Sequence, residues 1–178
     1  MPWSILVIGT AIPPVMGGLE VYTWELAYQL SQRGHQITLF GYQSFLDSPL
    51  YEVDRGVHIY RFPSLPLIGN KLYWLQAYQK AKELYSQYQW QICHAQTAAP
   101  AGMTSALLKK KYHIPSVITS HGYELIVRAK QVWVEPFVRY AFRYSDYVIG
   151  VSEELSQLSK HYGAIQTVTW ANAVDTQR

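Results

Sequence analysis

Two short segments of the sequence hold residue types that could handle a sugar or an anionic ligand. Residues 13–20 read PPVMGGLE and join the apolar run ILVIG to an amphipathic stretch. Glycine has no Cβ atom, so a ligand can approach the backbone N–H groups that the first turn of a helix leaves unpaired. We therefore expect Gly17 and Gly18 to lie beside a sugar or a phosphate, and Glu20 is a further candidate substrate-binding residue. A tight strand-to-helix turn, with glycines needed for conformation only, is the alternative.

The second segment reads SVITSHGYE and places His121 directly after an apolar run. A histidine at the end of a buried strand can hydrogen-bond a substrate hydroxyl or a phosphate oxygen, and a nearby carboxylate can orient it. His121 is therefore the candidate catalytic residue, with Gly122, Tyr123 and Glu124 as candidate substrate-binding residues. A loop histidine beside a solvated glutamate is the alternative. His94 ends the run QICHA in the same way and joins the candidates, although its own pattern is more typical of a half-buried histidine with satisfied hydrogen bonds.

Several well-known catalytic patterns are missing from the sequence. It contains no G-x-G-x-x-G dinucleotide fingerprint, no GK[ST] of a P-loop and no G-x-S-x-G nucleophile elbow. No two histidines lie within one helical turn of each other and Cys93 is the only cysteine, which argues against a structural zinc site. No D-x-D pair is present to hold a metal against a diphosphate. We expect neither a metal nor a cofactor.

Short apolar runs alternate with amphipathic ones along the chain, and these elements must position both segments. The predicted strands cover residues 5–9, 36–41, 57–62, 91–95, 116–120, 147–151 and 167–171. The predicted helices cover residues 19–33, 71–90, 101–112 and 132–144, with another from Ser152. In the first helix, the apolar face is expected to hold Leu19, Tyr22, Leu26 and Leu30. Residues 47–56 and 63–70 are interpreted as surface loops.

Strands that alternate with helices predict a single α/β domain with a Rossmann-like, doubly wound, mostly parallel sheet. In such sheets, ligands bind outside the carboxyl ends of the strands, where both candidate segments lie. The 178 residues are 49% hydrophobic and 15% charged, which is typical of a globular domain with a sizeable core.

Charge and cysteine content narrow the partners and the compartment. The formal net charge of +3 is too small to indicate a nucleic-acid partner. With one cysteine, no internal disulfide can form, so a reducing, cytoplasmic location is expected. Neither a charged leader nor a membrane-spanning stretch is evident. Residues 124–147 mix arginines with aromatic residues, a pattern that fits a core-packed helix better than a helix on an anionic membrane surface.

Taken in order, several motifs resemble the N-terminal half of family-4 retaining glycosyltransferases of the GT-B fold. They are GG-x-E with LAYQLSQRGH after it, HAQTAAPAG, PSVITSHGYE, DYVIGVSEEL and NAVDTQR. These look like the GG-x-E, HAH, P-x-V-x-T-x-HG-x-E, D-x-V-x-x-VS and NGVD segments of that family. Two positions depart from it: Gln96 stands where a second histidine is common, and Ala173 replaces the glycine of NGVD.

The resemblance implies two Rossmann-like domains that face a cleft. Residues 1–178 would be the N-terminal domain, which contacts a glycan or lipid-linked acceptor, with Gly17 and Gly18 lining the cleft and His121 near the transferred sugar. The C-terminal domain, which mainly binds the nucleotide-sugar donor, would follow Arg178 and is absent from this chain. Sugar transfer would retain the anomeric configuration without a tightly bound metal. We expect the chain to be inactive alone, because the groups that stabilise a leaving diphosphate would lie in the missing domain. Contact with the inner face of a membrane is compatible with a lipid-linked acceptor.

Two other functions remain open at this point. One is a non-catalytic half-domain that binds a glycan or scaffolds a partner. The other is part of a sugar-nucleotide epimerase, which would share the GT-B architecture but would need no acceptor.

Overall fold

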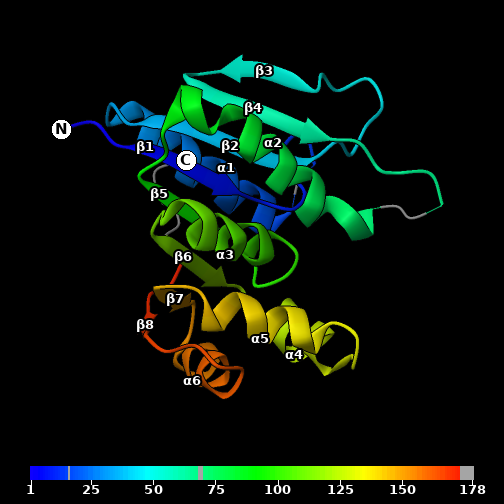
Figure 1. The fold of residues 1–178 in the computed structure, drawn as a ribbon, viewed down its shortest axis with the longest axis vertical. Helices are drawn as coiled ribbons and strands as arrows, with labels where there is room; N and C mark the ends of the chain where they lie inside the picture. Colours follow the sequence, from blue (N-terminus) through cyan, green and yellow to red (C-terminus); the bar gives the residue numbers. More distant parts are fainter. Residues whose placement is uncertain (16, 68–69, 173–178) are drawn as a thin grey trace.

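A computed structural model describes residues 1–15, 17–67 and 70–172. Figure 1 shows the strands side by side in one sheet with helices packed on its faces. The strands are β1 (Ser4–Ile8), β2 (Gln36–Tyr42), β3 (Tyr51–Asp54), β4 (Val57–Phe62), β5 (Ile92–Ala95), β6 (Ser116–Ser120), β7 (Tyr147–Gly150) and β8 (Thr167–Thr169). The α-helices are α1 (Gly18–Gln32), α2 (Tyr73–Tyr88), α3 (Ala101–Tyr112), α4 (Tyr123–Ile126), α5 (Glu135–Arg143) and α6 (Glu153–His161). Short 3₁₀ turns cover Asn70–Leu72 and Arg128–Lys130.

The sheet has the strand order β3-β4-β2-β1-β5-β6-β7-β8. Every neighbouring pair is parallel except β3 and β4. The predicted α/β class with a mostly parallel sheet is therefore confirmed. The chain order reverses at β1, which pairs with β2 on one side and with β5 on the other. Such a reversal opens a crevice at the carboxyl ends of the two strands.

Helices cover both faces of the sheet because the central strands are apolar on both sides. In β1, Leu6, Val7 and Ile8 are fully buried in succession. Helices α2, α3 and α5 cross the near face of the sheet in Figure 1, and α1 lies behind it. Trp24 and Ala27 of α1 pack on the second face in one apolar cluster. This packing fixes where each strand ends, and so positions the loops that follow the strands.

One predicted loop is a strand. Residues 47–56 were expected to form a surface loop, but Tyr51–Asp54 form β3, antiparallel to β4 at the sheet edge. The segment alternates exposed and half-buried residues, and the Tyr51 hydroxyl lies 3.0 Å from His58 Nδ1 on β4. The prediction was wrong because a short edge strand with two acidic residues lacks the apolar run that identifies buried strands.

The helix predictions hold in outline and differ in detail. As expected, the first helix ends at RGH: Gly34 has φ +85° and its N–H donates to Ser31 O at 2.9 Å. Of the expected apolar face, Leu30 packs against the apolar cluster beneath α1, but the residues that α1 buries most deeply are Thr23, Trp24 and Ala27. The helix predicted over 132–144 spans only Glu135–Arg143 as α5. Within the described ranges, no helix has the length and apolar character needed to cross a bilayer.

Candidate active site

A cavity of about 540 Å³ opens at the carboxyl edge of the sheet, where the strand order reverses. Five of the predicted site residues line it, namely Gly18, Glu20, His121, Tyr123 and Glu124. They come from the start of α1 and from the segment after β6, which are a hundred residues apart in the sequence. The structure therefore brings together the two segments that the sequence singled out.

His121 is held between three neighbours at the floor of this cavity. Its Nε2 lies 3.3 Å from Gln96 Oε1, and its Nδ1 lies 3.5 Å from the amide nitrogen of Asn172. One tautomer satisfies both contacts: Nε2–H donates to Gln96, and Nδ1 accepts from Asn172. The Tyr22 ring packs against the imidazole at 5.0 Å between centroids. The orientation of the imidazole is thus fixed by protein contacts.

Burial keeps the two central histidines neutral. It lowers the pKa of His121 to about 4. It also lowers the pKa of His94 to about 4, with a smaller contribution in the same direction from His121. Both groups are therefore uncharged at neutral pH, because their pKa lies far below 7. A neutral imidazole can exchange hydrogen bonds with a sugar hydroxyl but offers no fixed positive charge to a phosphate.

The turn after β6 depends on Gly122 and Glu124. Gly122 has φ +115°, a backbone conformation that side chains other than glycine rarely adopt. This turn lets Glu124 Oε1 fold back and accept from the His121 N–H at 2.9 Å and from Ser120 Oγ at 3.0 Å. Glu124 is only 5% exposed, and burial raises the pKa of its carboxyl group. The carboxylate thus ties the strand end to the following turn and positions His121 through the backbone.

The two glycines at the start of α1 differ in their surroundings. A Cβ atom at Gly18 would have no neighbour within 4 Å, so this residue presents bare backbone to the cavity. At Gly17, the N-cap of α1, the Glu20 carboxylate lies directly against the position of a Cβ atom. Glu20 therefore covers part of the helix start that the sequence suggested would be open to an anion.

His94 lies beside the cavity instead of lining it. Its Nε2 lies 2.8 Å from Thr119 Oγ1 on the neighbouring strand, and its side chain is half-buried. This contact fits the half-buried, satisfied histidine that its sequence pattern favoured. Its place next to His121 supports the floor of the site.

Sequence reasoning missed several residues of the cavity. Tyr42 ends β2, so the strand-end rule that found His121 could have found it too; Thr97 lies in the loop after β5, to which that rule already points. Arg128 had no such signal, because the short helix α4 turns the chain before this residue reaches the cavity wall. The NAVD motif lies outside the described residues except for Asn172, which lines the cavity.

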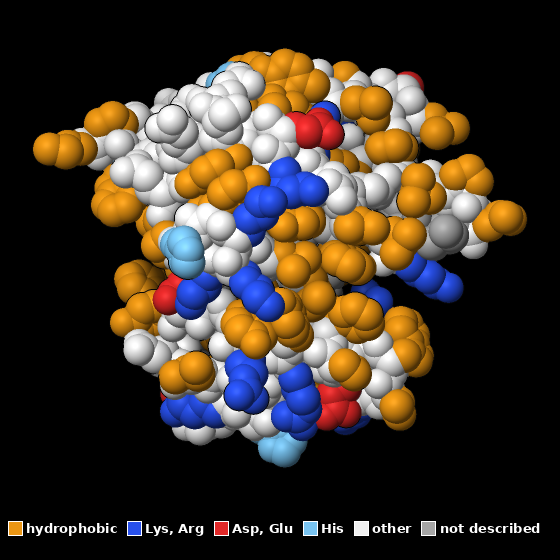
Figure 2. All heavy atoms as spheres, viewed as in Figure 1, with side chains coloured by type: hydrophobic (Ala, Val, Ile, Leu, Met, Phe, Trp, Pro, Cys, Tyr) orange, Lys and Arg blue, Asp and Glu red, His pale blue; other side chains and the backbone are white. Residues whose placement is uncertain are grey.

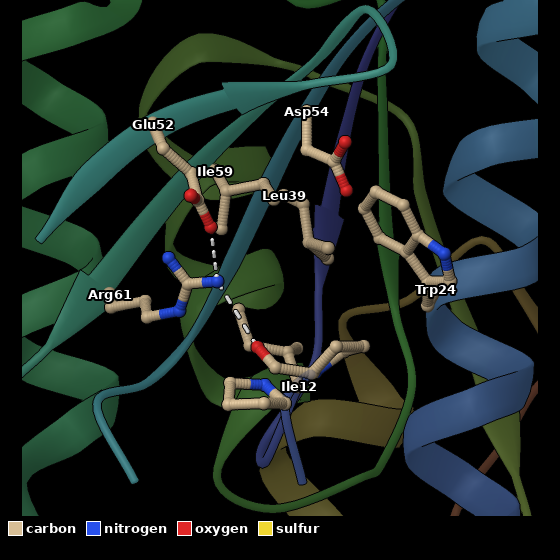
Figure 3. Close-up of a pocket in the computed structure, with 9 residues that line it drawn as sticks. Ile12, Trp24, Leu39, Glu52, Asp54, Ile59 and Arg61 are labelled. Atoms are coloured by element: carbon tan, nitrogen blue, oxygen red, sulfur yellow. Dashed lines mark hydrogen bonds and ion pairs between the residues drawn. The ribbon is translucent and has the colours of Figure 1, made fainter. Parts of the chain in front are cut away.

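A smaller cavity of about 210 Å³ lies on the α1 side of the sheet and contains the buried Arg61. The guanidinium group pairs with Glu52 Oε1 and donates to Pro13 O at 3.1 Å and to Pro49 O at 3.2 Å. Figure 3 shows Arg61 and Glu52 pointing toward one another. Arg61 thereby anchors the start of the turn that carries Gly17 and Gly18. Within the described part of the chain, no group of three or more potential metal-ligating side chains occurs.

Comparison with known proteins matches most of the chain to a family. The model described as Glycosyltransferase Family 4 matches residues 16–178. The chain belongs to this family. The match spans the glycine turn, the His121 segment and every element from α1 onward.

Curated relatives of this family 4 chain are distant but cover much of its length. An uncharacterized glycosyltransferase of Methanocaldococcus jannaschii is 26% identical over 140 residues, which is 79% of this chain and 38% of that protein. The N-acetyl-alpha-D-glucosaminyl L-malate synthase of Bacillus anthracis is 28% identical over 171 residues, 92% of this chain and 44% of the synthase. The family 4 chain thus spans less than half the length of these relatives.

Solved structures share the fold. Sucrose-phosphate synthase from Thermosynechococcus elongatus superimposes with a TM-score of 0.77 at 14% identity, covering 97% of this family 4 chain and 49% of the synthase chain. Anabaena HepE in complex with UDP-glucose gives a TM-score of 0.66 at 18% identity, covering 96% of this chain and 44% of HepE. These neighbours are GT-B glycosyltransferases, so the fold of this chain corresponds to about half of theirs.

Proposed function

We propose that this domain is the acceptor-side half of a glycosyltransferase that moves a sugar from a nucleotide sugar to an acceptor with retention of configuration. One observation carries the proposal. The open glycine at the start of α1 and the neutral His121 line the same cavity at the reversal point of the sheet. A second domain placed over this edge would close the cavity into a cleft. Solved relatives with UDP or UDP-glucose bound support a nucleotide-sugar donor.

Each residue has a role in this proposal. His121 Nδ1, whose contact with Asn172 is long at 3.5 Å, exchanges that contact for a hydrogen bond from a hydroxyl group of the transferred sugar. The exposed Tyr123 ring offers a flat surface for a sugar of the acceptor. Gly18 lets the donor or the acceptor approach the backbone, and Glu20 accepts hydrogen bonds from sugar hydroxyls. Gly122 and Glu124 hold the turn that positions His121.

The isolated chain is proposed to be inactive. The carboxyl edge of the sheet offers one cation, Arg128, within the described lining of the cavity. A leaving nucleoside diphosphate needs several positioned cations or helix N-termini for stabilisation. We place those groups in a donor domain beyond residue 178. The test is sugar transfer from a panel of nucleotide sugars by the 178-residue chain and by the protein translated from the whole gene. Transfer by the short chain would contradict the division of roles, and no transfer by the longer protein would contradict the proposed function itself.

A membrane-borne acceptor is part of the proposal. Tyr123, which lines the cavity, is 68% exposed, and Val132 and Trp133 further along the chain are 85% and 61% exposed. Figure 2 shows that the face carrying α2, α3 and α5 presents Lys and Arg side chains between apolar ones, with fewer acidic groups. Exposed aromatic and basic side chains together favour an anionic bilayer surface. The buried free thiol of Cys93 fits a reducing, cytoplasmic compartment. Flotation with anionic and neutral liposomes tests this part: no binding to anionic liposomes at low salt would remove it.

A further inference from the structure

Arg128 stands apart from the other partly buried basic residues of the domain. Arg61 pairs with Glu52, Lys80 pairs with Glu83 and Lys109 pairs with Asp146, while the Lys82 ammonium group lies over the Tyr78 ring. Arg128 is half-buried and lines the cavity, yet its guanidinium group forms no hydrogen bond or ion pair with another described residue. A cation that is partly removed from water without a counter-charge is costly unless a ligand supplies that charge. The proposed sugar-handling role of the cavity does not account for it.

Hydrogen-bond donors without partners lie around the same cavity. The Thr97 hydroxyl is buried and has no hydrogen-bond partner among the described residues, and Thr97 lines the cavity. The amide nitrogen of Gln96, whose oxygen meets His121, is likewise buried without a partner in the described part of the chain. Tyr42 also lines the cavity, and it lies close enough to Arg128 for the positive charge to act on its phenol. Buried donors are normally satisfied, so this group indicates a ligand rich in acceptor atoms.

The two carboxylates of the cavity indicate where such a ligand would bind. Glu124 Oε1 is already engaged by Ser120 and by the His121 N–H. The Glu20 carboxylate lies against Gly17 at the start of α1, where it disfavours a second negative charge. An anion is therefore disfavoured at the glycine turn and favoured beside Arg128, the cation that lines the same cavity.

We propose that Arg128, together with Thr97 and Tyr42, binds a phosphate or carboxylate group of the substrate that enters the His121 cavity. The inference rests on the proposed function for the identity of the cavity as a substrate site. A guanidinium group can donate two parallel hydrogen bonds to either anion, and hydroxyl donors complete the coordination. The anionic group belongs either to a negatively charged acceptor or to the diphosphate of the donor.

Calorimetric titration of the 178-residue chain and of two variants tests the proposal. Arg128→Gln removes the charge, and Lys130→Gln is the matched control because Lys130 is exposed on the same 3₁₀ turn. The probes are inorganic phosphate, glucose 6-phosphate, UDP and uncharged glucose. We expect Arg128→Gln to lower the affinity for at least one charged probe by about tenfold or more and to leave the affinity for glucose unchanged. Lys130→Gln should change each affinity by less than about twofold. Equal melting temperatures of both variants and the wild type confirm that the fold is intact.

The pattern across the probes identifies the source of the anion. Loss of glucose 6-phosphate binding with UDP binding retained assigns Arg128 to the acceptor, and the reverse assigns it to the donor. The proposal would be overturned if Arg128→Gln left the affinity for every charged probe unchanged. It would also be overturned if Lys130→Gln weakened binding of the charged probes as much as Arg128→Gln does. A wild-type chain that binds none of the charged probes would overturn it as well. These results are independent of sugar transfer by the longer protein, so the anion site and the proposed function can fail separately.

Discussion

Replacing Gly122 by alanine tests the turn that positions His121. The backbone at Gly122 has φ +115°, while a Cβ atom there would meet only ordinary contacts, at 3.6 Å from Ile126 Cδ1 and from Leu155 Cδ1. The cost of Gly122→Ala is therefore conformational and not steric. Backbone strain of this kind amounts to about 1–3 kcal/mol. For a domain of this size, about 2 kcal/mol lowers the melting temperature by about 4–8 °C.

The matched control is Gly18→Ala at the other wall of the cavity. Its backbone lies outside the positive-φ region, and a Cβ atom there would have no neighbour within 4 Å. We expect Gly18→Ala to stay within about 0.5 kcal/mol of the wild type, because alanine is also the better helix former. Urea denaturation followed by tryptophan fluorescence measures both variants. A Gly122→Ala variant as stable as Gly18→Ala would refute the explanation of this turn.

Three further predictions concern stability. Because burial lowers the pKa of His121 and His94 to about 4, below the ordinary value of about 6.5, the unfolded chain binds more protons between these pH values. The urea midpoint should therefore fall as the pH drops from about 6.5 toward 4, and less steeply in His94→Gln; a flat profile would contradict the burial of these rings. Arg61→Met removes three contacts and should lower the free energy of unfolding, measured by urea denaturation, by about 2–4 kcal/mol. Lys80→Met, in the exposed Lys80–Glu83 pair, should lower it by less than about 0.5 kcal/mol. Gly150→Ala would place a Cβ atom 2.5 Å from the Ser156 backbone N, so α6 must shift. The shift should lower the free energy of unfolding by about 1–3 kcal/mol. A melting temperature equal to that of the wild type would contradict such close packing of β7 against α6.

The sequence was sufficient to predict the fold class and the edge of the sheet that holds the site. Continuous apolar runs such as ILVIG and SVITS mark buried parallel strands, and ligands bind at the carboxyl ends of such strands. This rule places Gly18 and His121 at the same edge of the sheet, and both line the cavity there. The same rule points to the loop after β5, which holds Thr97, and applied to β2 it would have added Tyr42.

Other features depend on tertiary contacts that leave no local pattern. Glu20 covers Gly17, a side-chain position that the G-G-x-E spacing does not reveal. Arg61 reads as an ordinary strand residue, although it anchors Pro13 from a distance of 48 positions. Arg128 was grouped with a basic and aromatic stretch, because its sequence neighbours give no sign that the segment from Gly122 through α4 brings it to the cavity. Each of these outcomes is decided by which residues the fold brings together in space.

The most direct test of the central claim is the rate of sugar transfer by the His121→Ala variant of the protein translated from the whole gene. His161→Ala is the control, because His161 is exposed on α6 and does not line the cavity. If His121 contacts the reacting sugar, its loss should lower the rate by about a hundredfold or more while His161→Ala stays near the wild-type rate. A His121→Ala variant that transfers sugar at the wild-type rate would contradict the assignment of this cavity as the active site.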